Sequence, residues 1–386
     1  MAALSTFHVR GWLIALALSL VGSACSKGGA SGAGGADGRF GVGGGGGPSG
    51  AGGAKSDASA GGSGAGVGGQ VGAGGTAGVG GSGPVDAGLD VGSRGDARTT
   101  PKLSWALTTP GWDAAFISGA AGGELWIATR TGSALQIRAD GTSNATLLNL
   151  LNNAFVTGLW VAAANNAYVS ANANVVLHWD GSGTWKRDVM ASGRVFPAVW
   201  GSSPTDVYAS AGAEVYHSTG NDQWTLQTLR DLPLGPLAAL TGTGPNDLWL
   251  AGAAGEIYRS TGDGMWPQET KTGIVYVNQL WAASPSEAYF VTNTAIAHRH
   301  PSGTWVTEPT PRTDTELILS IWGSGPTDVY AGTDQGHLFH SVGDGVWQND
   351  GFDAGPGLTI DINGIWGRSA TDVYLATSLG IYHGQP

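Results

Sequence analysis

Histidine is the first residue type whose spacing suggests chemistry, because imidazole is a common metal ligand and a general base near neutral pH. Five of the eight histidines recur about 40 residues apart, or twice that: His178, His217, His298, His340 and His383. We place Arg138 and Arg259 at the same point of two further units. Residues that recur once per structural repeat lie far apart in space, so we predict no shared metal site and no cofactor. His300 and His337 stand outside the pattern as isolated residues.

Tryptophan is the second such residue type, because indole rings stack on sugars. Most of the 16 tryptophans fall in two series with one period: Trp160, Trp200, Trp281, Trp322, Trp366, and Trp105, Trp185, Trp224, Trp266, Trp305, Trp347. A buried aromatic hides roughly 150 to 250 Å², so packing explains both series. Trp126 and Trp249 take the tyrosine position of a following strand. After the signal segment, only Trp112 and Trp179 escape the register, and we name them as candidate ligand contacts with packing as the alternative.

These side chains belong to a unit that opens with a nearly constant phrase. Residues 321–330 read IWGSGPTDVY, and variants stand at 199–208, 240–249 and 365–374. The aligned positions are Ser118, Trp160, Trp200, Thr241, Trp281, Trp322 and Trp366, spaced by 42, 40, 41, 40, 41 and 44 residues. Short apolar runs between Gly, Pro, Asn and Asp turns predict strands. Seven such units predict an all-β fold, a seven-bladed β-propeller of four-stranded blades over residues 102–386.

The two ends of this region complete each other. The last unit stops at its third strand, while residues 102–110, KLSWALTTP, match the fourth-strand pattern of TWVTEPTP at 304–311. We therefore predict that the N-terminal strand completes the seventh blade, which removes an open sheet edge. An acidic residue six positions after the aligned one is expected to cap a turn: Asp206, Asp247, Asp328 and Asp372.

The N-terminus carries a different chemistry, at Cys25, the only cysteine. Residues 1–25 have a weakly basic start, an apolar run and small residues, the pattern of a secretory signal. The ending VGSAC resembles the lipobox of bacterial lipoproteins, with Gly22 in the usual place of leucine. The resemblance implies acylation of the Cys25 thiol and a membrane partner through that lipid. The alternative is ordinary signal cleavage near Ala24.

The segment after this cysteine has a composition typical of a tether. No aspartate follows Cys25, which by resemblance to lipoprotein sorting implies the outer membrane of the cell envelope, facing the periplasm or the surface. Residues 28–100 hold 31 of the 68 glycines and almost no large apolar side chain. Such a chain cannot offset its backbone entropy by burial, so we expect residues 26–101 to be a disordered linker.

The loops that join one blade to the next are where a binding surface is expected, because they vary while the strands repeat. Their charged candidates are Arg194, Arg230, Asp231, Lys271, Arg312, Asp314, Asp353 and Asp361. The alternative is that these are ordinary solvated loops. We find no nucleophile, acid and base among them in a recognisable arrangement, and we predict no catalytic residue.

Several short patterns resemble known propeller repeats. The turns at 260–266 (STGDGMW) and 341–347 (SVGDGVW) resemble degenerate Asp-boxes of the BNR family, and 255–266 (GEIYRSTGDGMW) is similar to tectonin-type lectin propellers. Lipobox, Gly-rich tether and WGSxPxDVY repeats together resemble secreted lipoproteins of myxobacteria. This resemblance implies architecture only, since the arginine cluster of the BNR glycosidases cannot be assembled here. WD40 repeats are disfavoured because their Gly-His and Trp-Asp signatures do not recur.

Composition narrows the function classes. The formal net charge of −11 argues against a nucleic-acid partner, which would need clustered Lys and Arg. We therefore predict a monomeric, non-enzymatic binding or scaffold propeller with a glycan or protein ligand. A lectin and a BNR-like glycosidase or lyase stay open as alternatives.

Overall fold

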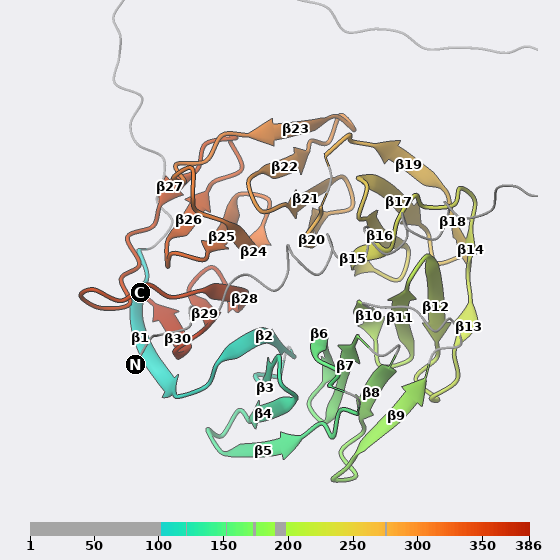
Figure 1. Cartoon of the computed structure of the whole chain (residues 1–386), viewed down its shortest axis with the longest axis horizontal. Coiled ribbons are helices and arrows are strands. Elements are labelled where there is room, and N and C mark those ends of the chain that lie inside the picture. The colour runs from blue at the N-terminus through green and yellow to red at the C-terminus, as the bar shows by residue number, and fades with distance from the viewer. Residues whose placement is uncertain (1–101, 121, 152, 173–174, 190–197, 275) are drawn as a thin grey trace, which may run out of the picture. The chain divides into compact units, whose positions relative to one another are not determined.

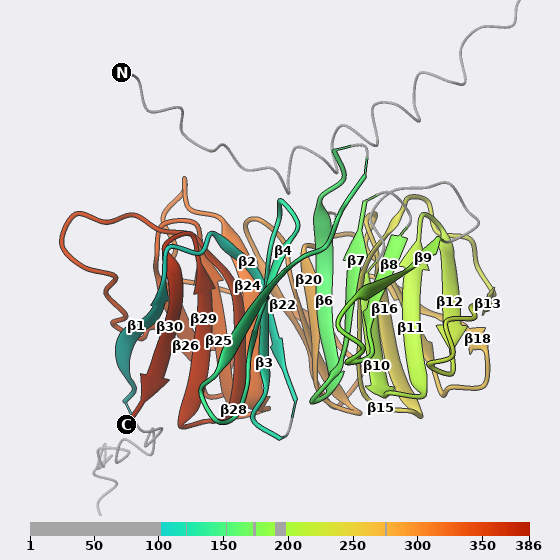
Figure 2. The ribbon, with the colours of Figure 1, turned by 90° about the horizontal axis from the view of Figure 1, so that it is seen from below.

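The computed structural model describes residues 102–120, 122–151, 153–172, 175–189, 198–274 and 276–386. Over these residues the chain forms seven four-stranded sheets arranged as blades around a central axis (Figure 1). Side-on, the strands run between the two faces of the ring (Figure 2). The predicted seven-bladed β-propeller is confirmed. The predicted signal peptide, Cys25 and the linker lie outside the described residues.

The first four blades follow one another along the chain. The strands of blade 1 are β2 (Ala114–Gly119), β3 (Leu125–Thr129), β4 (Ser133–Ile137) and β5 (Ser143–Leu147). The strands of blade 2 are β6 (Val156–Ala163), β7 (Asn166–Ala171), β8 (Val175–Trp179) and β9 (Trp185–Val189). The strands of blade 3 are β10 (Val199–Ser203), β11 (Asp206–Ala211), β12 (Glu214–Ser218) and β13 (Thr225–Leu226). The strands of blade 4 are β15 (Leu237–Gly244), β16 (Asp247–Gly252), β17 (Glu256–Ser260) and β19 (Gln268–Lys271).

The last three blades complete the ring. The strands of blade 5 are β20 (Gln279–Ser284), β21 (Glu287–Val291), β22 (Ile296–Arg299) and β23 (Trp305–Glu308). The strands of blade 6 are β24 (Ile318–Gly325), β25 (Asp328–Thr333), β26 (Leu338–Ser341) and β27 (Gln348–Asn349). The strands of blade 7 are β28 (Ile362–Ser369), β29 (Asp372–Thr377), β30 (Gly380–Gln385) and β1 (Ser104–Pro110).

Blade 7 is closed by the first strand of the propeller, as predicted. Strand β1 pairs antiparallel with β30 from Ser104 opposite Gln385 to Pro110 opposite Gly380. The indole of Trp105 packs edge-on against Phe352 at a centroid distance of 5.6 Å. The last blade is thus held from both ends of the propeller, and its outer edge is paired.

Blade 4 departs from the simple pattern at its outer edge. The predicted fourth strand is divided, because β18 (Met265–Trp266) leaves the sheet and pairs in parallel with β14 (Thr228–Leu229) of the preceding blade. The remainder, β19, pairs with β17. No helix among the described residues is long and apolar enough to cross a membrane.

The hydrophobic core lies between the blades. Tyr168 and Val176 of blade 2 are buried against Val207 and Ala209 of blade 3, and the same arrangement joins the other neighbours. A single blade would leave one such face exposed, so the repeat is stable only as a ring of stacked sheets.

Candidate functional site

The innermost strands of the seven blades surround a cavity of about 350 Å³ on the propeller axis. Its wall carries one aligned residue from each blade: Ser118, Trp160, Trp200, Thr241, Trp281, Trp322 and Trp366. None of the described residues that line this cavity is ionisable. The site is therefore a cavity with no ionisable residue in its described wall, ringed by five indoles, and its volume is near the lower end of the roughly 300 to 1,000 Å³ typical of ligand pockets.

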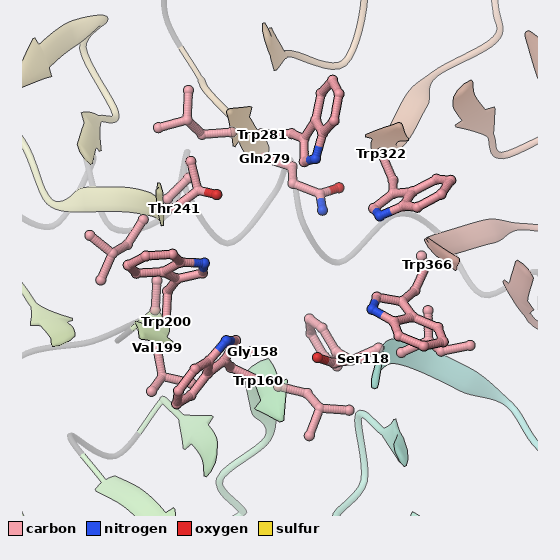
Figure 3. A pocket seen from close by; sticks show the side chains of 18 of the residues that line it. Ser118, Gly158, Trp160, Val199, Trp200, Thr241, Gln279, Trp281, Trp322 and Trp366 are labelled. Carbon is pink, nitrogen blue, oxygen red and sulfur yellow. The ribbon is translucent and has the colours of Figure 1, made fainter. Parts of the chain in front are cut away.

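The five indoles of this wall share one orientation. Figure 3 shows the ring nitrogen of each facing the axis, so that the rings present their edges to the cavity. The five side chains are half-buried, and none of these N–H groups has a hydrogen-bond partner among the described residues. An indole nitrogen is a donor only, and the edge of an aromatic ring is its electropositive part. The cavity thus offers donors and positive edges.

Glycine follows the aligned residue because the preceding blade needs the space. A Cβ atom at Gly201 would lie 2.6 Å from Cη2 of Trp160 and 2.5 Å from the backbone oxygen of Asp206. Five glycines meet the tryptophan of the blade before them: Gly119, Gly201, Gly242, Gly323 and Gly367. The glycine of the repeated Trp-Gly motif is therefore required by a contact with the neighbouring blade.

The two blades that come after a blade with serine or threonine at the aligned position confirm this explanation for the glycine. After Ser118 the corresponding position of the next blade is Val161, and after Thr241 it is Ala282. With no indole to fill the space, a side chain is accommodated. The Val161 N–H donates to the Ser118 hydroxyl at 3.1 Å, a bond between blades 1 and 2.

The recurring histidines form a polar network inside the blades. Each stacks on the tyrosine opposite it, as Tyr374 does on His383 at a centroid distance of 4.0 Å. His217, His340 and His383 each place Nε2 within 2.9 Å of the acidic residue at the start of the second strand: Asp206, Asp328 and Asp372. The Asp328 carboxylate also accepts a hydrogen bond from Ser324 at 2.6 Å. These contacts fasten the turn to the sheet, which supports the structural interpretation.

Burial keeps the phenols of this network neutral. It raises the pKa of Tyr168, Tyr289 and Tyr330 far above the usual value of 10.0, and nearby carboxylates add to the effect. Such groups cannot serve as bases near neutral pH.

One predicted member of the histidine series is wrong. The residue opposite Trp126 is Gln136, and Arg138 lies two positions further along the chain. Gln136 could not be recognised from the sequence as the member of this series in blade 1, because that blade lacks both the tryptophan and the tyrosine of the repeated motif. Gln136 is buried and donates to Glu124, which also accepts from the Trp126 indole at 2.9 Å.

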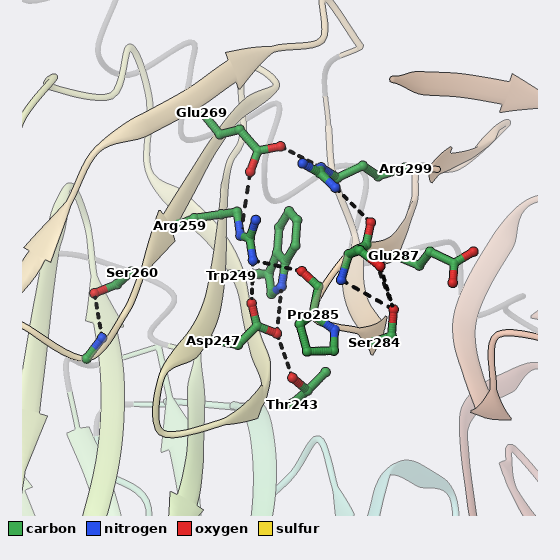
Figure 4. Close-up of polar contacts among 12 residues, drawn as sticks. Thr243, Asp247, Trp249, Arg259, Ser260, Glu269, Ser284, Pro285, Glu287 and Arg299 are labelled. Carbon is green, nitrogen blue, oxygen red and sulfur yellow. Dashed lines mark hydrogen bonds and ion pairs between the residues drawn. The ribbon is translucent and has the colours of Figure 1, made fainter. Parts of the chain in front are cut away.

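Blade 4 uses arginine in place of histidine (Figure 4). Arg259 lies 4.1 Å above the Trp249 ring and donates to Asp247 at 2.6 Å. Glu269 joins this arginine to Arg299 of blade 5, whose Nε lies 2.6 Å from the carboxylate. The group is a cation–π and ion-pair bridge between two blades, and every charge in it has a partner.

Two histidines predicted to be isolated have partners. The His300 ring packs against His298 at a centroid distance of 4.2 Å with the ring planes tilted by 42°, and Nδ1 of His337 lies 2.7 Å from Glu316. His298, His300 and Glu308 gather closely enough to ligate a cation. Both oxygens of Glu308 are already used, by His298 at 2.8 Å and by the Trp347 indole at 2.8 Å. A metal would displace these bonds, so the group is better explained as a brace between blades 5 and 6.

The structure scatters the predicted loop residues. Arg230, Asp231 and Asp314 are exposed, while Arg312 donates to backbone oxygens of its own loop and of Thr294. Lys271 lies 3.8 Å from Glu256, and the Asp353 carboxylate accepts a hydrogen bond from the backbone N–H of Gly355 in its own turn. Asp361 interacts electrostatically with Arg130, and Arg194 lies outside the described residues. These side chains do not converge on one site.

The two candidate tryptophans have packing roles. Trp179 is 5% exposed and touches Trp126 and Trp185 edge-on or tilted, so no face is open to a ligand. Trp112 is half-buried and packs against the core between blades 7 and 1. The residues that sequence reasoning passed over are the aligned tryptophans themselves, which were assigned to packing. Their spacing identified the strand, but only the ring shows that their N–H groups meet at the axis.

These features define a seven-bladed β-propeller with an aromatic axial cavity. No family model matches the sequence, and no curated protein matches it. Among solved structures, YCF48 bound to D1 peptide is similar at 13% identity and TM-score 0.59, over 74% of this chain and 95% of that one. A catalytically inactive virginiamycin B lyase from Staphylococcus aureus with quinupristin matches at 15% and 0.61, over 74% and 99%. The WD40 propeller domain of Doa1 matches at 12% and 0.57, over 73% and 96%. At these identities the likeness is one of fold.

Proposed function

We propose that this protein is a non-enzymatic binding propeller displayed on the cell envelope. The observation that carries the proposal is the axial cavity, a donor-rich aromatic pocket with no ionisable residue in its described wall. General acid–base catalysis needs ionisable groups within hydrogen-bond reach of a substrate. In the described network the recurring acids and histidines bond one another within the blades.

The similar structures support binding without deciding the ligand. YCF48 is bound to a D1 peptide and the virginiamycin B lyase is seen with quinupristin, so this fold accommodates both a peptide-binding protein and a lyase. A peptide or protein ligand is our leading assignment, and a glycan is the alternative that an aromatic wall favours. A glycosidase or lyase would need unlike ionisable groups on neighbouring loops, and the described loop candidates do not converge.

A paired array separates these ligand classes. The chain from residue 26 onward, which omits the proposed signal peptide, is applied to a glycan array and to a peptide array. Saturable binding to peptides, lost in the presence of free peptide, is the expected result. Binding confined to glycans would replace the leading assignment with the lectin. Turnover of a bound glycan would refute the non-enzymatic proposal itself.

The envelope location rests on the N-terminal sequence. Cys25 ends a secretory-type segment and is the only thiol, so we propose that it carries the lipid that places the propeller at the outer membrane, as a monomer. Two or three acyl chains give stable anchoring, because each buried methylene contributes about 0.8 kcal/mol. The linker of residues 26–101 would then have a root-mean-square reach of roughly 45 Å.

A further inference from the structure

We propose that the axial ring binds a compact monovalent anion, such as the carboxylate of a small ligand. The axial ring is defined as Trp160, Trp200, Trp281, Trp322 and Trp366 together with Ser118 and Thr241. This inference deepens the proposed binding function, on which it rests, by naming the chemistry that the cavity recognises.

The donors of the axial ring have no acceptor within the part of the chain that the structure describes. The five indole N–H groups face the axis and have no acceptor among the described residues (Figure 3). The Ser118 oxygen accepts the Val161 N–H, so its own hydrogen remains to be donated. Gln279 projects into the same cavity, and its carbonyl oxygen accepts the Ile321 N–H at 3.0 Å, which leaves its amide nitrogen as a donor.

The axial donors differ from the other indoles in their surroundings: Trp179, Trp266 and Trp305 have buried N–H groups with no partner among the described residues, whereas the axial N–H groups line a cavity. Outside the axial ring several indoles reach a carboxylate or hydroxyl: Trp185 reaches Thr146 at 3.1 Å, Trp224 reaches Asp188 at 3.0 Å, and Trp347 reaches Glu308 at 2.8 Å. Those bonds connect the outer strands of neighbouring blades. The described wall of the axial cavity supplies no carboxylate to take such a role.

The electrostatics select an anion of low charge. Indole edges are electropositive, so five edges around one axis make a region that favours negative charge. A cation would need the ring faces, which are turned away from the axis in Figure 3. A dianion such as phosphate is normally held by Arg or Lys, and the described wall has neither. Neutral N–H donors therefore match a carboxylate or a halide.

The test uses the full chain labelled with ¹⁵N at tryptophan. Sodium acetate, sodium chloride and neutral acetamide are titrated separately, with ionic strength held constant by sodium sulfate, and the indole N–H resonances are followed by NMR. We expect the five axial resonances, assigned by single Trp→Phe variants, to shift together and to saturate with acetate. Saturation with chloride as well would show that any small anion fits, and saturation with acetate alone would show a preference for carboxylates.

Two variants distinguish binding at the axial ring from a general effect of salt on the resonances. Trp322→Phe keeps an aromatic side chain but removes one N–H donor, and it should weaken acetate binding about tenfold, since a hydrogen bond to a charged group contributes on that scale. Trp347→Phe is the matched control, because its N–H already bonds Glu308 away from the axis. Linear shifts with no saturation, or equal responses to acetamide and acetate, would overturn the inference. Because the arrays test binding independently, ligand capture there would leave the proposed function standing.

Discussion

At the scale of single residues, the contacts between neighbouring blades depend on pairs of residues, one in each blade. A tryptophan in one blade requires a glycine after the aligned residue of the next, and a serine or threonine permits Val161 or Ala282. The same two blades with a small aligned residue place a larger ring on the second strand, at Trp126 and Trp249. In these two blades the tryptophan thus stands on the second strand instead of the first, and the space between the strands remains well packed.

This pairing predicts a non-additive mutant cycle. Gly201→Ala should lower the free energy of unfolding by about 1 to 3 kcal/mol, the usual cost of overpacking, because its Cβ meets the Trp160 ring. Trp160→Ser alone should cost about 3 to 5 kcal/mol through the cavity that it leaves. The double variant should lose at least about 1 kcal/mol less than the sum, because the two residues are in contact. Urea unfolding of the four proteins measures the coupling.

A distant tryptophan supplies the control for this cycle. Trp322 contacts Gly367 and not Gly201, so Trp322→Ser combined with Gly201→Ala should be additive within about 0.5 kcal/mol. Additivity in the Trp160 cycle as well would show that the clash with the Asp206 backbone oxygen alone demands the glycine.

The network at Asp372 predicts a pH dependence of stability. Burial pushes the pKa of this carboxyl upward, but hydrogen bonds from Arg368 and His383 outweigh it, so the pKa lies below its ordinary 3.8. The unfolded chain then binds the proton first, so the stabilisation is present above about pH 4 and is lost as the pH falls through the folded-state pKa. Asp372→Asn should lose about 1 kcal/mol at pH 7 and converge with the parent once the pH has fallen through the lowered folded-state pKa of Asp372. Urea melts across that range test it, with the exposed Asp353→Asn as control.

The site was less predictable from sequence than the network was. Asp, Tyr and His recur at fixed distances in the chain, so their structural role could be inferred from the repeat alone. The axial donors recur just as regularly, yet the sequence cannot say toward which side an indole edge points. That direction is set by the next blade's Gly201 and its equivalents, which are some 40 residues away.

At the scale of elements, strand boundaries were predictable where the repeat is strong and not where blades interact sideways. The apolar runs of blade 6 predict strands at 318–323, 329–333, 337–341 and 346–350, and all four observed strands lie within two residues of those bounds. The outer strand of blade 4 is divided at Pro267, which lies between β18 and β19 and has no N–H to donate to a sheet. The residues before this proline, Met265 and Trp266, pair with Thr228 and Leu229 across the blade boundary.

Closure of blade 7 gives a prediction at this scale. Removal of residues 102–110 exposes the edge of β30 and removes Trp105, the packing partner of Phe352, so the melting temperature should fall markedly. Deletion of residues 28–95 is the comparison, because its composition predicts that it buries nothing. Thermal melts of both truncated proteins decide the matter, and equal melting temperatures would contradict the role assigned to β1.

At the scale of the whole molecule, the proposed anchor predicts a change of compartment. The parent chain should partition with membranes and gain the mass of acyl chains at Cys25. Cys25→Ser, which removes the acceptor thiol and alters no residue of the propeller, should be recovered in the soluble fraction with an unchanged melting temperature. Labelled palmitate incorporation and detergent phase partition measure this. Membrane recovery of the Cys25→Ser protein would contradict lipidation at this residue.

The positions of the charged residues around the ring argue against catalysis and lead to a prediction about hydrolytic activity. The recurring acids and histidines are bonded inside separate blades and do not converge on one substrate, so an enzyme of this fold would have to place unlike ionisable groups on neighbouring loops. Here the recurring acids are bonded within blades, and Asp353 caps its own turn. We therefore expect no hydrolysis above background on sialyl, glucosyl and polyuronate substrates. Turnover that Asp353→Asn or Asp361→Asn abolishes would instead establish the glycosidase or lyase alternative, because a change in one loop carboxylate removes an acid or base without disturbing the sheets.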